Sequence, residues 1–180
     1  MDGAVEQAAY GGHRARLPKR NIQRTFPVRW CDTATPPNIR ECRSPPVTPQ
    51  VIAYFADDPT RVYQLLQWLP VLERLDATHP VGILTRDAAT RDIVTERTTL
   101  PVLFAPPGFN DLAQLYDELD AAVVLYCNNS MTNFNSLLDG RMMHVHINHG
   151  ESDKHSMVSN NAKAYDRVFV AGEAAVQRHR

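Results

Sequence analysis

The sequence predicts an α/β fold in which helices cover both faces of a doubly wound, mostly parallel sheet. Six short segments are apolar at successive positions rather than at every second position, as in strands buried on both faces. Stretches with helical spacing separate these segments, and successive runs lie roughly 20–30 residues apart, about the length of one βα unit. The longest uninterrupted apolar run, Ala121–Cys127, has seven residues and is too short to cross a bilayer.

The expected strands follow one another along the second part of the chain. They are Val51–Ala56, Val81–Leu84, Val102–Ala105, Ala121–Cys127, Met143–Ile147 and Val168–Ala171. After the first of them, Asp58 precedes Pro59, which predicts a helix N-cap followed by proline at the first helical position. Leucines at helical spacing continue from there to Leu75, and Pro70 should kink this helix or divide it.

A further helix is expected before the fourth strand. Leu112, Leu115 and Leu119 recur at helical spacing, and Asn110 or Asp111 could open the helix as its N-cap. With this helix, the second part of the chain alternates strand and helix throughout, as a doubly wound sheet requires.

The first 50 residues differ in composition from the rest. They hold seven of the 13 prolines and carry eight Lys and Arg against four Asp and Glu, whereas the whole chain has a net charge of −1. Apolar periodicity is absent from this segment, so we predict a disordered, Pro-rich basic leader over residues 1–50 and one Rossmann-like lobe over 51–180. The basic excess would favour association with an anionic membrane surface.

The location and some classes of partner also follow from composition. The N-terminus lacks the pattern of a secretory signal, and the cysteines Cys31, Cys42 and Cys127 are too few and too scattered for a disulfide framework. We therefore expect a cytoplasmic protein. The nearly balanced charge predicts no nucleic acid as a partner.

Ligands of doubly wound sheets bind beyond the carboxyl ends of the strands. The loops there include Asp57-Asp58, Asn128-Asn129-Ser130 and His149-Gly150. Neither GxGxxG nor GxxxxGK[ST] occurs, so no dinucleotide cofactor is expected. We interpret Asn128, Asn129 and Ser130 as hydrogen-bonding groups for substrate hydroxyls, with an alternative role in turns and caps. For Asp57-Asp58, capping of the following helix is the simpler interpretation.

Four of the seven histidines fall between positions 144 and 155, and three hypotheses compete for them. His144, His146 and His149 form an HxHxxH pattern typical of zinc sites, but Asn148 stands where a second-metal carboxylate would be expected. In the second hypothesis, His149 transfers a proton and Lys154 contacts phosphoryl oxygens across a turn made by Gly150. In the third, His144 and His146 simply pack against the helices.

The segment Ile147–Lys154 resembles the HGxxxK element of the CDP-glycerol glycerophosphotransferases, and residues 160–172 resemble the segment that re-enters the sheet after it. The resemblance implies a GT-B fold, with two Rossmann-like lobes of which this chain supplies the N-terminal one. It also implies that His149 is the catalytic base and that Gly150 and Lys154 bind substrate. The loop differs from the HGTxxK form, since Glu151 and Asp153 make it more acidic.

The implied function is transfer of glycerol phosphate from CDP-glycerol to a cell-wall polymer or lipid-linked acceptor, as in teichoic acid biosynthesis, without metal or other cofactor. The acceptor would be a polyol phosphate or a lipid-linked polymer, reached at the inner face of the cell membrane by a peripheral membrane protein. We expect the donor, CDP-glycerol or a similar nucleotide-activated compound, to bind a second lobe that residues 51–180 do not include. Alternatives are a non-catalytic acceptor-binding lobe and a zinc hydrolase built on His144, His146 and His149.

Overall fold

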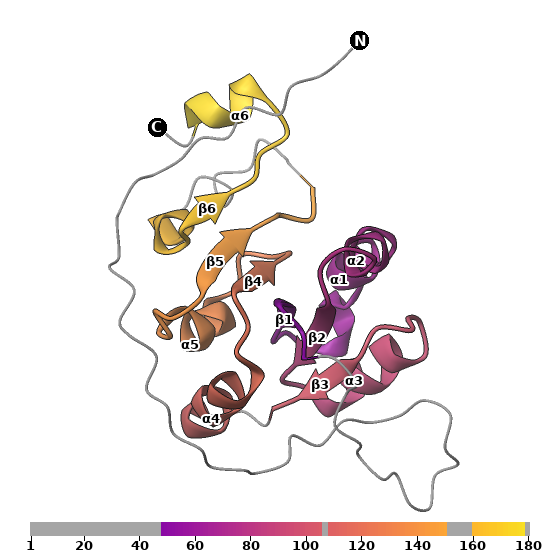
Figure 1. The fold of residues 1–180 in the computed structure, drawn as a ribbon. Coiled ribbons are helices and arrows are strands. Elements are labelled where there is room, and N and C mark those ends of the chain that lie inside the picture. The colour runs from indigo at the N-terminus through magenta and orange to yellow at the C-terminus, as the bar shows by residue number, and fades with distance from the viewer. Residues whose placement is uncertain (1–47, 106–107, 151–159, 179–180) are drawn as a thin grey trace, which may run out of the picture.

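The computed structural model describes residues 48–105, 108–150 and 160–178, which form a six-stranded sheet with helices on both faces (Figure 1). The strands are β1 (Val51–Phe55), β2 (Val81–Thr85), β3 (Val102–Phe104), β4 (Val123–Tyr126), β5 (Met143–His146) and β6 (Arg167–Val168). Every neighbouring pair is parallel, and the order is β3-β2-β1-β4-β5-β6. The predicted doubly wound α/β fold is therefore confirmed. The disordered leader was predicted over residues 1–50, and residues 1–47 lie outside the part of the chain that the structure describes.

Each predicted apolar run contains or overlaps one strand. The runs that begin at Val51, Val81, Val102 and Met143 start at the same residue as the strand that they predict. The largest difference is at β6, which comprises only Arg167–Val168 although the run was expected to begin at Val168. This strand lies at the edge of the sheet, where only one neighbour is available to extend its hydrogen-bonded ladder.

The helical segments lie between the strands in chain order. They are η1 (Pro59–Arg61), α1 (Tyr63–Leu66), α2 (Leu69–Asp76), α3 (Ala88–Thr95), α4 (Phe109–Leu119), η2 (Met131–Asn133), α5 (Phe134–Leu137), η4 (Asn160–Ala164) and α6 (Glu173–Arg178). Helices α1–α3 pack on one face of the sheet, and α4 and α5 pack on the other. No helix in the described ranges is long and apolar enough to cross a membrane.

Local sequence signals account for most helix ends. Asp58 caps η1, because its carboxylate accepts a hydrogen bond from the Thr60 N–H at 2.8 Å. The predicted division at Pro70 is also observed, since α1 ends at Leu66 and Pro70 lies in the first turn of α2. Helix α4 begins earlier than expected, with Gly108 at its N-cap, and Asp111 lies in its first turn.

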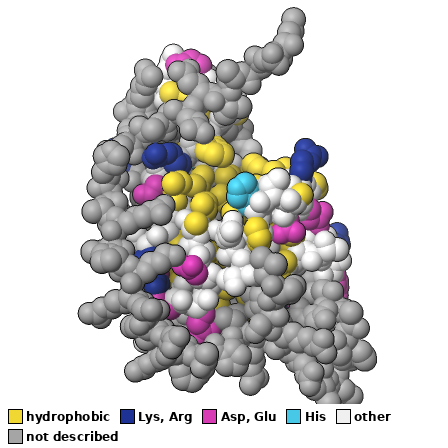
Figure 2. Space-filling model, in the orientation of Figure 1, with side chains coloured by type: hydrophobic (Ala, Val, Ile, Leu, Met, Phe, Trp, Pro, Cys, Tyr) yellow, Lys and Arg dark blue, Asp and Glu magenta, His cyan; other side chains and the backbone are white. Residues whose placement is uncertain are grey.

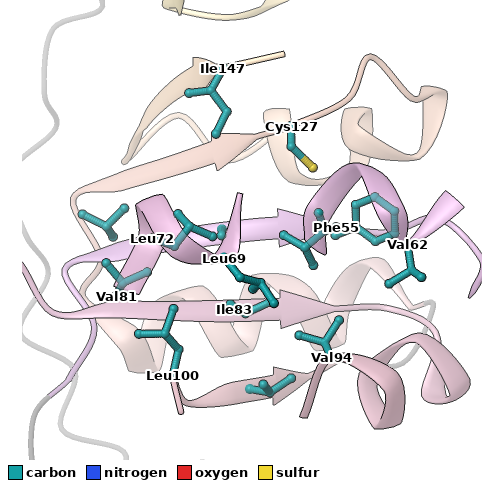
Figure 3. Close-up of a cluster of buried hydrophobic side chains, with 14 of the residues drawn as sticks. Phe55, Val62, Leu69, Leu72, Val81, Ile83, Val94, Leu100, Cys127 and Ile147 are labelled. Atoms are coloured by element: carbon teal, nitrogen blue, oxygen red, sulfur yellow. The ribbon is translucent and has the colours of Figure 1, made fainter. Parts of the chain in front are cut away.

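The core consists of two clusters, one on each face of the sheet. Figure 3 shows the cluster under α1–α3, where Leu69 and Leu72 of α2 meet Ile83 of β2. Alternation along β4 and β5 places Cys127 and Ile147 in this cluster, while Tyr126 points to the α4–α5 face. Strands with apolar side chains on both faces are therefore buried from both sides, which explains their continuous apolar runs.

A directed chain of hydrogen bonds crosses the α4–α5 face. The Asp139 carbonyl can only accept, so His144 donates to it from Nε2 at 2.6 Å. With the imidazole neutral, His144 Nδ1 accepts from the Tyr126 hydroxyl at 2.8 Å. The Tyr126 oxygen then accepts from Ser136 at 2.6 Å, and Ser136 accepts from Tyr116 at 2.5 Å. The hypothesis that His144 packs against the helices is thus supported.

Alkaline pH is expected to lower the free energy of unfolding of the chain. Burial raises the pKa of Cys127 from 9.0 to about 12 and that of Tyr165 from 10.0 to about 12. The folded pKa values lie above the unfolded ones, so stability is complete below pH 9 and falls as the unfolded state loses these protons first. Each such group should remove about 1.4 kcal/mol per pH unit until its folded pKa is reached.

The measurement is urea unfolding under reducing conditions at pH 7.5, 9, 10 and 11. Between pH 9 and 10 Cys127 should contribute the largest single share of the loss, because its unfolded pKa of 9.0 lies below the 10.0 of the buried tyrosines. Cys127→Ala should therefore reduce the loss of stability between pH 9 and 10 and keep the loss above pH 10 that the tyrosines cause. An unchanged loss between pH 9 and 10 in the variant would contradict the assignment.

Candidate functional site

The strand order reverses between β1 and β4, and the loops after these two strands meet at the carboxyl edge of the sheet. Such a reversal opens a crevice that binds ligands in other doubly wound sheets. Asp57-Asp58 follows β1, and Cys127-Asn128-Asn129-Ser130 follows β4. The loop at His149 follows the next strand, β5. The structure thus places the loops that were predicted to carry chemistry at neighbouring positions along one edge.

Asp57 is the centre of a hydrogen-bonded cluster that joins the loops after β1 and β4. Its carboxylate is 7% exposed. Oδ1 accepts from Ser130 Oγ at 2.5 Å and from Thr132 Oγ1 at 3.1 Å. Oδ2 accepts from Asn128 Nδ2 at 3.0 Å and from an Arg61 guanidinium nitrogen at 3.2 Å. The expectation that Asp57-Asp58 only caps a helix is therefore incomplete, because Asp58 provides the cap and Asp57 links two strands.

The asparagines after β4 are largely held by the protein itself. Asn128 is buried, and its amide also donates to Gln64 Oε1 at 3.1 Å. The Asn133 amide donates to the Asn128 carbonyl oxygen at 2.7 Å and to the Tyr165 hydroxyl at 3.0 Å. Asn129 lies half-buried in the same loop. The structure brings Asn128 and Ser130 together with Asp57, while their contact with substrate hydroxyls remains a prediction.

A second charged group lies one strand away from the crevice. Arg86 follows β2, is 6% exposed, and donates to the Gly108 carbonyl oxygen at 2.8 Å. Burial raises the pKa of the Tyr54 hydroxyl, and the positive charge and hydrogen bond of Arg86 oppose that rise. The described edge therefore carries a buried carboxylate and a buried guanidinium on neighbouring strands.

His149 is half-buried beyond the end of β5, and its imidazole has a defined orientation. Nδ1 lies 3.1 Å from the Cys127 carbonyl oxygen. Since a carbonyl oxygen can only accept, Nδ1 carries the hydrogen, and in the neutral ring Nε2 carries the lone pair. Cys127 immediately precedes Asn128, so the imidazole is hydrogen-bonded to the residue next to a member of the Asp57 cluster. His149 is thus oriented so that its basic nitrogen is Nε2.

The turn at His149 uses two residues in unusual backbone conformations. Asn148 has φ 63°. Gly150 has φ 133°, a value that residues other than glycine rarely adopt. This agrees with the expectation that Gly150 allows the backbone to turn, and its contact with substrate remains a prediction. Lys154, the other predicted phosphate ligand, lies outside the described residues.

The histidines of the HxHxxH pattern do not come together. His144 and His146 are buried on the α4–α5 face, where the His146 ring lies 4.9 Å from that of Tyr165. Both ring nitrogens of His144 have protein partners, and His149 points its Nδ1 at Cys127. Within the residues described, no group of three or more His, Cys, Asp or Glu side chains could hold a metal ion. The zinc hydrolase hypothesis therefore has no ligand set in this part of the chain.

Several contributors to the site were not predicted from the sequence. Gln64 and Gln67 of the α1 region contact the loops after β4 and β5, and Trp68 contacts Asn148. Gln64 and Gln67 could have been found from the sequence, because two amides three residues apart in a leucine-rich helix lie on one face of that helix. Thr132, whose hydroxyl donates to Asp57 across 75 residues, has no such local signal, since the three-residue helix η2 contains no second hydroxyl side chain.

Apolar side chains gather on one face of the molecule. Figure 2 shows hydrophobic side chains gathered over β4 and β5, beside a histidine. Leu125 of β4 is half-buried, and Phe169, whose N–H donates to the His146 carbonyl oxygen, is 45% exposed. The half of the sheet from β4 to β6 therefore also carries accessible apolar side chains.

The fold and the site together define a doubly wound, Rossmann-like α/β lobe with its polar groups at the switch point of the sheet. Comparisons of the chain with protein-family models, with curated proteins and with solved structures each find no match.

Proposed function

We propose that the chain is the acceptor-side lobe of a GT-B-type glycerophosphotransferase, which moves glycerol phosphate from CDP-glycerol to a polyol-phosphate or lipid-linked acceptor. The observation that carries the proposal is the orientation of His149, whose Nδ1 is bound to the Cys127 carbonyl so that Nε2 is the basic nitrogen. A general base needs a lone pair directed outward on a group that the protein holds in place. His149 also lies in the loop whose sequence resembles the HGxxxK element.

In the proposed reaction, the acceptor hydroxyl attacks the β-phosphorus of CDP-glycerol. A new P–O bond forms to the acceptor oxygen, the bond from phosphorus to the CMP oxygen breaks, and CMP leaves. His149 Nε2 takes the proton of the attacking hydroxyl as the new bond forms. Positioning of the hydroxyl against Nε2 would supply much of the rate enhancement.

The polar groups at the switch point favour the acceptor over the donor as the ligand of this lobe. The Asp57 carboxylate, Asn128 and Ser130 are suited to the terminal hydroxyl groups of an acceptor, whereas a buried carboxylate would repel the diphosphate of the donor at the same position. The accessible apolar side chains, Leu125 and Phe169 among them, would suit the lipid portion of an acceptor. These features also favour the second candidate, a lobe that binds the acceptor without catalysing transfer.

The test combines turnover with binding. Because the donor is expected to bind a second lobe, the purified chain is combined with the donor-binding lobe of a CDP-glycerol glycerophosphotransferase. The mixture is incubated with CDP-glycerol and a glycerol phosphate oligomer, and release of CMP is followed by chromatography. In parallel, the oligomer alone is titrated into the protein while the imidazole resonances of His149 are recorded by NMR. We expect CMP release that depends on the acceptor, together with perturbation of His149. Perturbation without CMP release would identify the acceptor-binding lobe, and the absence of both would contradict the proposal.

A further inference from the structure

The turn that carries His149 is held by side chains from the junction between α1 and α2. Trp68 Nε1 donates to the Asn148 carbonyl oxygen at 2.6 Å, across 80 residues of sequence. Gln67 Nε2 donates to the His149 carbonyl oxygen at 2.7 Å, across 82 residues. Trp68 is half-buried and packs against the core cluster under α1–α3, so its indole N–H comes from a well-fixed ring. Two successive carbonyl groups of the turn therefore point at one helical junction.

Asn148, which belongs to the same turn, stabilises it through a local hydrogen bond. Its backbone is in the left-handed region, with φ 63°, and its side-chain Oδ1 accepts from the His149 N–H at 2.9 Å. Asparagine is one of the few residues other than glycine that adopt this region readily, because its short polar side chain can hydrogen-bond the nearby backbone. The main-chain N–H and C=O of His149 and its ring Nδ1 all have partners within the described part of the chain.

We propose that Trp68 and Gln67 are positioning residues, which hold His149 in the tautomer that leaves Nε2 able to accept a proton. The proposal rests on the function proposed above, in which His149 is the general base. If the two carbonyl groups lost their donors, the turn could rotate, and the Nδ1–Cys127 hydrogen bond at 3.1 Å would be the first contact to lengthen. The ring would then populate both tautomers, and the fraction with a basic Nε2 would fall.

The same helical region also contacts both loops of the site, the loop after β4 that contains Asn128 and the loop after β5 that contains His149. Gln64, three residues before Gln67, accepts from the Asn128 amide at 3.1 Å. Residues three apart lie on one face of a helix, so this face contacts the loop after β4 through Gln64 and the loop after β5 through Gln67. A shift of α1 would therefore move Asn128 relative to His149.

The test uses Trp68→Phe, which keeps an aromatic ring and removes the N–H, and Gln67→Leu, which removes the amide at an exposed position. Gln114→Leu is the matched control, because Gln114 is an exposed glutamine on α4 whose amide contacts only Glu118 among the described residues. The tautomer of His149 is read from long-range ¹⁵N–¹H NMR spectra of the imidazole. In the wild-type and control proteins we expect the Nδ1–H form, and in both variants a mixture of the two forms.

Turnover supplies the second readout. We expect kcat for CMP release to fall on the order of tenfold in each variant, with KM changed less than twofold, because orientation rather than binding is lost. An Nε2–H tautomer in the wild-type protein, or an unchanged Nδ1–H tautomer in the well-folded Gln67→Leu variant, would overturn the proposal. Since the spectra need no turnover, absence of CMP release from the wild-type protein would contradict the transferase function and leave the positioning role to be decided by the tautomer.

Discussion

Replacement of His149 by glutamine is expected to lower the rate of glycerol phosphate transfer by roughly 10²–10⁴-fold. Glutamine approximates the size of the imidazole and can still hydrogen-bond the Cys127 carbonyl oxygen, which lies 3.1 Å from Nδ1 in the wild type. Its amide cannot accept a proton at neutral pH, so the attacking hydroxyl would have to lose its proton to water. The measurement is the initial rate of CMP release at saturating CDP-glycerol and acceptor.

The matched control for this variant is His79→Gln, the same chemical change at an exposed histidine. His79 lies between α2 and β2, and its ring contacts Thr78. We expect the control to retain the wild-type rate and both proteins to unfold at similar urea concentrations. A His149→Gln protein that keeps more than about a third of the wild-type rate would exclude general base catalysis by this residue, because a true base contributes far more.

The fold was largely predictable because its determinants are local in sequence. A strand buried on both faces needs apolar side chains at successive positions, so runs such as Val51–Ala56 are visible without any tertiary information. Pro70 and Asp58 act within one helical turn, and both had the predicted effect. β6 was placed less accurately, since an edge strand of two residues is defined by its one partner, β5.

The site was predictable in its location but not in its contacts. Parallel strands end at one edge, so the loops containing Asn128 and His149 were expected together. Which side chains meet there depends on β1 lying beside β4, which results from the chain crossing back over the sheet after β3. Asp57 and Asp58 illustrate the difference, because these adjacent carboxylates look alike in sequence while one is exposed and the other links two strands.

Asp57→Ala is expected to lower the free energy of unfolding by about 3 kcal/mol, the scale for breaking a buried, charged hydrogen-bond network. The substitution removes the acceptor of Ser130, Thr132 and Asn128 at once, and Asn128 is buried where water cannot fully replace it. The ion pair with Arg61 adds little to this loss, because the Arg61 side chain is 58% exposed. Urea unfolding followed by circular dichroism measures the change.

Two further variants separate the network from the charge alone. Asp57→Asn keeps one acceptor oxygen, which can face Asn128, and its amide can donate to the Ser130 and Thr132 hydroxyl oxygens, so we expect roughly half the loss seen with alanine. Asp92→Ala removes a carboxylate whose side chain is 56% exposed and which pairs with Arg91, and it should cost less than about 1 kcal/mol. If Asp57→Ala cost no more than Asp92→Ala, the carboxylate would not be what joins β1 to the loop after β4. The loss in free energy of unfolding should therefore be largest for Asp57→Ala, smaller for Asp57→Asn and smallest for Asp92→Ala. The loss depends on how many buried donors lose their acceptor, and of the two carboxylates only Asp57 accepts from side chains on both sides of the switch point.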